Sequence, residues 1–108
     1  MSFKVKVDHW NCSAVGGHSV TTKPAALAGF VLTGTTNDPT FAIYNGAEAN
    51  TATENELYPS DSHDLSAHEY PYHFTPPFLI PAPDGIYIDV SVLAGGALEF
   101  TTYYTEDD

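Results

Sequence analysis

Apolar and polar residues alternate along most of this chain, and a period of two predicts strands and no long helix. The clearest segments are 85–93 (GIYIDVSVL) and 97–104 (ALEFTTYY), in which every second residue suits a buried face. The Gly95-Gly96 pair between them predicts a turn, so we expect a C-terminal β-hairpin. On its outer face, Tyr87 and Tyr103 would form a cross-strand pair.

Shorter strands are predicted over residues 25–34, 40–46, 57–58 and 70–74. The N-terminal strand or arm, residues 1–10, also alternates. Phe3, Val5 and Val7 lie on one of its faces, and Lys4, Lys6 and Asp8 lie on the other. Six to eight short strands with frequent turns predict one all-β domain over residues 1–108. We expect an antiparallel β-sandwich, for which a jelly roll is one form, with a frayed acidic tail at 105–108.

A proline-rich ribbon precedes the last two strands. Pro76-Pro77 and Pro81-x-Pro83 bracket the apolar residues 78–80, so this piece can pair with a neighbour over only a few residues. One interpretation is a crossover between two sheets, with Phe78 and Ile80 closing the end of the core. The other is an apolar edge segment that docks on a neighbouring subunit, and both can hold together.

Charge is the most skewed property of the chain. It has 14 acidic residues against three lysines and a net charge of −11 with histidine neutral. All three lysines lie within the first 23 residues, and every acid except Asp8 lies after them. Such a surface repels phosphate groups, so we expect no binding to nucleic acid or to anionic membranes.

The cysteine count and the hydropathy pattern set further bounds. Cys12 is the only cysteine, so neither an intrachain disulfide nor a zinc site built on cysteines is expected. The first ten residues have no apolar core of a secretory signal, and no run is long enough to span a bilayer. We therefore expect a protein that is made in the cytoplasm.

Candidate chemistry is sparse. His63, His68 and His73 are the candidates for metal ligands, but a spacing of five places them on no common face of a helix or strand. We expect no metal, no cofactor and no catalytic residue. Two alternatives stay open. One is an enzyme with a His-carboxylate site in the 61–73 loop, and the other is a carbohydrate-binding module using aromatic residues such as Trp10 and Tyr72.

The segments GFVLTGTTNDPTFAIYNG, AEANTATENELY, PPFLIPAPDGIYIDVSV and LEFTTYY together resemble small virion proteins of tailed bacteriophages. The resemblance implies a non-enzymatic structural protein of the virion, above all a head decoration or cement protein, with neck, tail or fibre placement as variants. It implies a homo-oligomer, with a trimer favoured. Its partners would be the major capsid protein or other virion proteins, and the lysines would meet an acidic shell. The expected partner-binding residues are Phe3, Lys4, Lys6, Trp10, Tyr72, Phe78, Leu79 and Ile80.

Overall fold

The computed structural model describes residues 3–35, 37–46, 56–62 and 71–107, and these form strands and turns without a helix. The strands are β1 (Phe3–Cys12), β2 (Gly16–Thr21), β3 (Ala25–Gly34), β4 (Asn37–Asn45), β5 (Glu56–Ser62), β6 (Tyr72–Phe74), β7 (Ile80–Ala82), β8 (Ile86–Ala94) and β9 (Leu98–Asp107).

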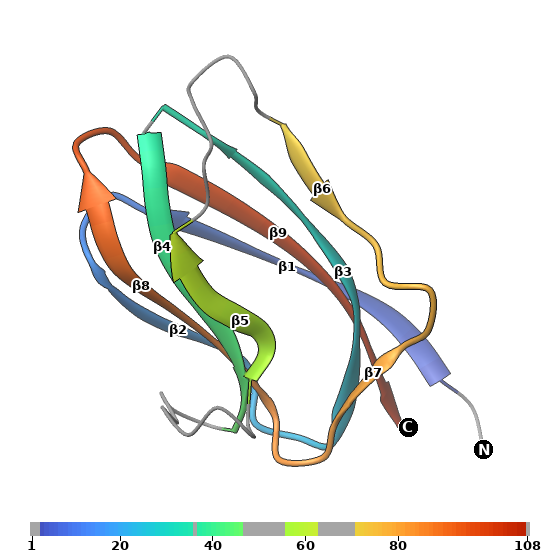
Figure 1. Cartoon of the computed structure of the whole chain (residues 1–108). Helices are drawn as coiled ribbons and strands as arrows, with labels where there is room; N and C mark the ends of the chain where they lie inside the picture. Colours follow the sequence, from blue (N-terminus) through green and yellow to red (C-terminus); the bar gives the residue numbers. More distant parts are fainter. Residues whose placement is uncertain (1–2, 36, 47–55, 63–70, 108) are drawn as a thin grey trace.

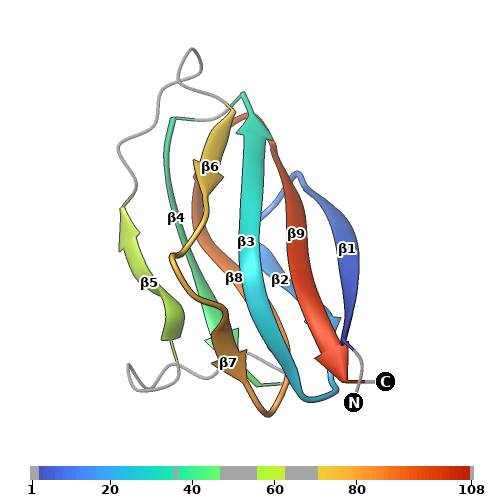
Figure 2. The ribbon, with the colours of Figure 1, turned by 90° about the vertical axis from the view of Figure 1, so that its right-hand side faces the viewer.

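These strands form two antiparallel sheets that pack face to face (Figure 1). One sheet has the order β1-β9-β3, and β6 and β7 both pair with the far side of β3. The other has the order β2-β8-β4-β5. Figure 2 shows β6 and β7 one after the other along β3, as two pieces of one interrupted strand. Counted in this way, the two four-stranded sheets have the strand order of a jelly roll, which confirms the predicted sandwich.

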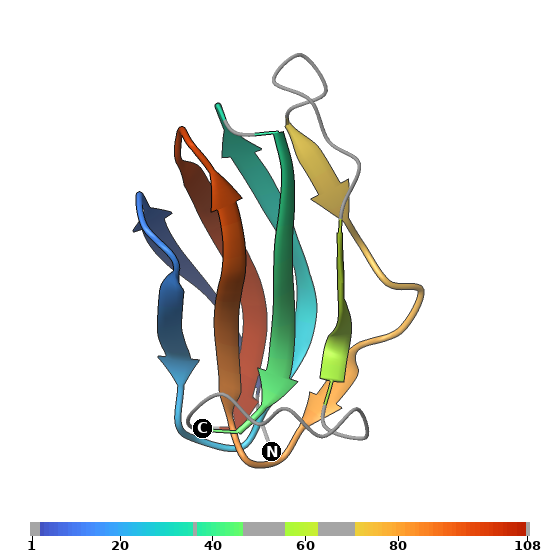
Figure 3. The same ribbon diagram turned by 60° about the vertical axis from the view of Figure 1, so that its left-hand side comes forward.

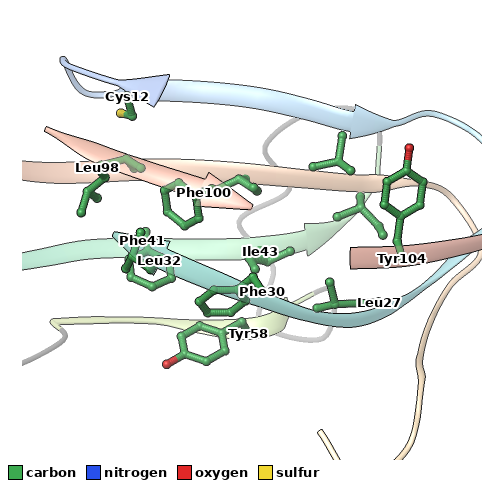
Figure 4. Packing of buried hydrophobic residues seen from close by; sticks show 14 of the residues in the cluster. Cys12, Leu27, Phe30, Leu32, Phe41, Ile43, Tyr58, Leu98, Phe100 and Tyr104 are labelled. Carbon is green, nitrogen blue, oxygen red and sulfur yellow. The ribbon is translucent and has the colours of Figure 1, made fainter. Parts of the chain in front are cut away.

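The core lies between the sheets and is built around aromatic rings (Figure 4). Phe30 of β3 is fully buried at its centre. Its ring contacts rings from both sheets and from the edge strands, namely Phe41, Tyr58, Tyr72, Phe74 and Phe100. Tilted and edge-on ring contacts of this kind add to the free energy gained by burying apolar area. Most of the apolar residues predicted to face inward in β8 and β9, such as Ile88 and Phe100, are buried as expected, but Val92 near the end of β8 is 47% exposed.

The predicted C-terminal hairpin is wrong. Both runs are strands, but β8 lies in the sheet with β2 and β4, whereas β9 lies in the sheet with β1 and β3. The Gly95-Gly96 turn therefore carries the chain from one sheet to the other. Tyr87 and Tyr103 are consequently not a cross-strand pair, because Tyr87 lies opposite Ser19 and Tyr44 while Tyr103 lies opposite Val7 and Gly29.

The proline-rich ribbon is not the crossover itself. Its two ends, β6 and β7, pair with the same strand, and residues 75–79 leave the sheet between them. The chain crosses to the other sheet only after Ala82. There Gly85 has φ of 114°, and an added Cβ would lie 2.5 Å from the carbonyl oxygen of Thr21, so this tight crossing requires glycine.

Candidate interaction surface

The first strand points its valines into solvent. From Val5 to Cys12, exposed residues alternate with half-buried or buried ones, which confirms the alternation read from the sequence. The outward residues include Val5 and Val7, which are 71% and 48% exposed. Lys6 and Asp8 point to the inner side, so the apolar face of this segment is the outer one. Tyr103, opposite Val7 on β9, extends the exposed surface. We call Val5, Val7 and Tyr103 the β1 face.

Trp10 and Cys12 explain this orientation. Both lie on the same face of β1 as Lys6 and Asp8, because all four occupy even-numbered positions. Cys12 is 2% exposed and Trp10 packs against the core, so this face is the inner one. A shift of one residue in a strand moves every side chain to the opposite face. Burying the indole and the thiol therefore forces the two valines outward.

The inward charges of β1 are paired at the open side of the sandwich, where β1 and β2 form the edges of the two sheets. The Lys6 ammonium lies 2.8 Å from Oε1 of Glu106, and the Thr21 hydroxyl donates to Oε2 of the same carboxylate. Glu106 is buried, and its side chain is 7% exposed. The hydrogen bonds from Lys6 and then Thr21 hold the pKa of Glu106 below its ordinary value. We call Lys6, Glu106, Thr21, Asp8 and His18 the polar seam.

The rest of the seam joins the two sheets. Nε2 of His18, on β2, lies 2.7 Å from Oδ2 of Asp8 on β1. The ring of Trp10 stacks on His18 at 5.1 Å and on Phe100 at 5.7 Å between centroids. Trp10 thus serves packing across the open side, and its ring is engaged inside the protein rather than presented for stacking on a sugar.

A second exposed apolar group lies on the opposite edge of the same sheet. Phe78 is 82% exposed and Leu79 is 53% exposed, and both belong to the segment that leaves the sheet between β6 and β7. The expectation that Phe78 closes the core is therefore wrong, whereas Ile80 is partly buried and packs against the core. We call Phe78 and Leu79 the 78–79 tip.

The other predicted site residues are scattered. Tyr72 is half-buried, and its hydroxyl lies 2.9 Å from that of Tyr58, which fixes β6 to β5. His73 is exposed on β6, opposite Val31. His63 and His68 lie outside the described residues. The backbone of Phe3 and Lys4 belongs to β1, but their side chains are not described.

Within the described ranges, no three His, Cys, Asp or Glu side chains gather closely enough to hold a metal ion. No helix in the same ranges is long and apolar enough to cross a membrane.

Burial raises the pKa of the Cys12 thiol, which donates a hydrogen bond to the carbonyl oxygen of Ala14 at 2.9 Å. Cys12 is therefore a packing residue with little thiolate character.

The β1 face could not be read from apolar content alone. The signal was the parity of Trp10 and Cys12, which fixes the direction of the whole strand. Asp8, His18 and Glu106 were not singled out as a group, because their meeting depends on which sheet each strand joins.

Fold and surface together define a jelly-roll β-sandwich with two exposed apolar patches on one sheet. No family model, curated protein or solved structure matches the chain.

Proposed function

We propose that this protein is a non-enzymatic structural component of a tailed-phage virion, and specifically a decoration protein on the outer surface of the head. The observation that carries the proposal is the 78–79 tip. A phenylalanine that is 82% exposed buries little area in the fold, and its burial in an interface is worth about 1.5–3 kcal/mol.

The tip is also built to hold its shape. β6 and β7 anchor it to β3 on both sides, and prolines at positions 76, 77 and 81 restrict its backbone. A pre-ordered segment loses little conformational entropy when it docks. Jelly rolls are common among viral capsid domains, and the sequence resembles small virion proteins, so the fold is compatible with this role. An acidic outer surface does not conflict with it, because the outside of a head does not contact the packaged DNA.

Particles purified on a density gradient from cells that carry the gene provide the direct test. We expect the chain to sediment with the heads in many copies, and antibodies to the chain to label the head surface in electron microscopy. Labelling at the neck, tail or fibres would move the assignment within the virion. Absence of the chain from the particles would overturn the proposal.

A matched pair of variants tests the tip. We expect Phe78→Ser/Leu79→Ser to lower the number of copies per head, because it removes both apolar side chains without touching the sheet pairing. Val15→Ser is the control, since Val15 is 59% exposed on the turn between β1 and β2. An equal effect of the two changes would show that the tip has no special part in binding.

A further inference from the structure

The outer edge of β1 can pair with another strand. Among the described residues, β1 is hydrogen-bonded to β9 alone, and it lies at the rim of its sheet (Figure 3). It is a long edge of ten residues. Exposed edges of this length usually carry devices that prevent pairing with other chains. On β1 the outward residues Val5 and Val7 are apolar. The inward charges of Lys6 and Asp8 deter most strands, but they are of opposite sign and can therefore match a partner with the complementary order of charges.

The order of charges along β1 identifies the partner. We propose that β1 pairs antiparallel with β1 of a second copy of this chain, about a two-fold axis through Val7. In this register Lys6 lies opposite Asp8 of the second copy, and Asp8 lies opposite its Lys6. Residues directly opposite in an antiparallel pair have Cβ atoms about 5 Å apart, which lets these charges interact.

Neighbouring registers are disfavoured by the same residues. Inward residues must lie opposite inward residues, so the two-fold axis, perpendicular to the sheet, must pass through a residue and not between two residues. The neighbouring registers therefore have the axis one residue earlier, at Lys6, or one residue later, at Asp8. With the axis at Lys6, two lysines face each other, and with the axis at Asp8, two aspartates do. Like charges directly opposite each other are destabilising, so only the register centred on Val7 pairs opposite charges without also placing two like charges opposite each other.

The intramolecular partners are compatible with this arrangement. The Lys6 ammonium is a compact charge on a flexible stem, so it can keep its bond to Glu106 while a carboxylate of the second copy lies close by. His18 bonds Oδ2 of Asp8, and a carboxylate can accept several hydrogen bonds. The charge around the β1 edge also favours this edge as the place where two copies of such an acidic chain meet. All three bases lie within the first 23 residues, so repulsion between two copies is weakest around β1.

The paired state extends the sheet of each copy across the axis. The strands overlap from residue 3 to residue 11, a length of about 30 Å. On the outer side, the axis brings the two Val7 side chains together and places each Val5 opposite His9 of the other copy. The result is one continuous eight-stranded sheet. It differs from the trimer that the sequence resemblance implies, and a mass measurement separates the two.

Light scattering coupled to size-exclusion chromatography, with sedimentation velocity, tests the pairing on the purified full chain. We expect twice the chain mass of 11.6 kDa. Val7→Glu would place two carboxylates on the axis, and we expect it to raise the dissociation constant at least tenfold. Val92→Glu is the control, because Val92 is 47% exposed, close to the 48% of Val7, but lies on β8 in the other sheet. Urea unfolding verifies that both variants fold.

Charge reversal tests the register. Lys6→Asp and Asp8→Lys should each be monomeric alone, and an equimolar mixture of the two should form a heterodimer, because each Asp then lies opposite a Lys. A wild-type chain that stays monomeric up to about 1 mM, forms a trimer, or keeps its dimer in Val7→Glu would overturn the proposal. The outcome is independent of virion association, because these measurements use the isolated chain.

Discussion

Thr21→Val tests the polar seam, because it removes one hydrogen bond to Glu106 at nearly constant side-chain volume. The Glu106 side chain is 7% exposed, so water replaces the lost donor poorly. A hydrogen bond to a charged group contributes about 1.5–3 kcal/mol. We expect the free energy of unfolding at pH 7 to fall by about 2 kcal/mol, which corresponds to roughly 8 °C in Tm for a domain of this size. The Lys23 amide also loses its acceptor, but that exposed bond contributes only about 0.5 kcal/mol.

The pH dependence separates the two losses. The pKa of Glu106 is held below its ordinary value, so its ionised form stabilises the fold above about pH 4.5, and this contribution is lost as the pH falls through the folded-state pKa. As the pH falls, the loss in free energy of unfolding caused by Thr21→Val should therefore shrink to the contribution of the Lys23 bond, which does not depend on pH.

Urea unfolding followed by the fluorescence of Trp10, the only tryptophan, measures both quantities from pH 7 down to the lowest pH at which the wild type is folded. Thr22→Val is the control, because Thr22 is exposed, and we expect no change at any pH. A Thr21→Val penalty of the same size at all pH values would refute the role given to Glu106. Full stability of the variant at pH 7 would refute it as well.

Three further substitutions test the core and the sheet. Phe30→Ala removes the ring at the centre of the aromatic cluster and should cost about 3–5 kcal/mol in urea unfolding. Gly29→Ala should lower Tm, because the new Cβ would lie 2.5 Å from the carbonyl oxygen of Phe74, whereas Gly16→Ala, at a similar φ but with no atom within 4 Å, should change Tm far less. Thr102→Val should raise the free energy of unfolding, measured with urea, by about 1 kcal/mol, because the buried Thr102 hydroxyl has no hydrogen-bond partner among the described residues.

The strands with the clearest alternation were predictable together with their inner faces, because burial of one face imposes a period of two. Ile86 to Val90 and Leu98 to Tyr104 show this directly. Their pairing was not predictable from the same pattern. Two strands joined by Gly95-Gly96 bury alternate residues equally well side by side in one sheet or face to face across a core. Turn chemistry constrains the bend, but the choice of sheet depends on contacts with β1 to β4.

The candidate surface was predictable in part. Docking on a neighbouring subunit was one of two interpretations of residues 78–80, because prolines interrupt pairing on both sides, and the structure leaves Phe78 and Leu79 exposed. The β1 face was not, because the local pattern FKVKVDHW does not show which side faces the core. That choice is made by Trp10 and Cys12, whose burial outweighs that of two valines at the rim of the sheet. When the two ends of a strand differ in burial, the face that points inward can be predicted only from the residues over its whole length.

The valines of β1 are largely exposed in the isolated chain, Val5 at 71% and Val7 at 48%, and this gives a final prediction. If Val5 and Val7 served only strand formation, threonine would replace them equally well, because it is also β-branched and of similar shape. Val5→Thr/Val7→Thr should therefore leave the free energy of unfolding of the monomer within about 0.5 kcal/mol of wild type, as substitutions at exposed positions usually do. The same change should weaken self-association measured by sedimentation velocity, because it places hydroxyl groups where apolar contact is needed. A loss of more than about 1 kcal/mol in monomer stability, or an unchanged dimer, would show that the valines serve the fold and not an interface.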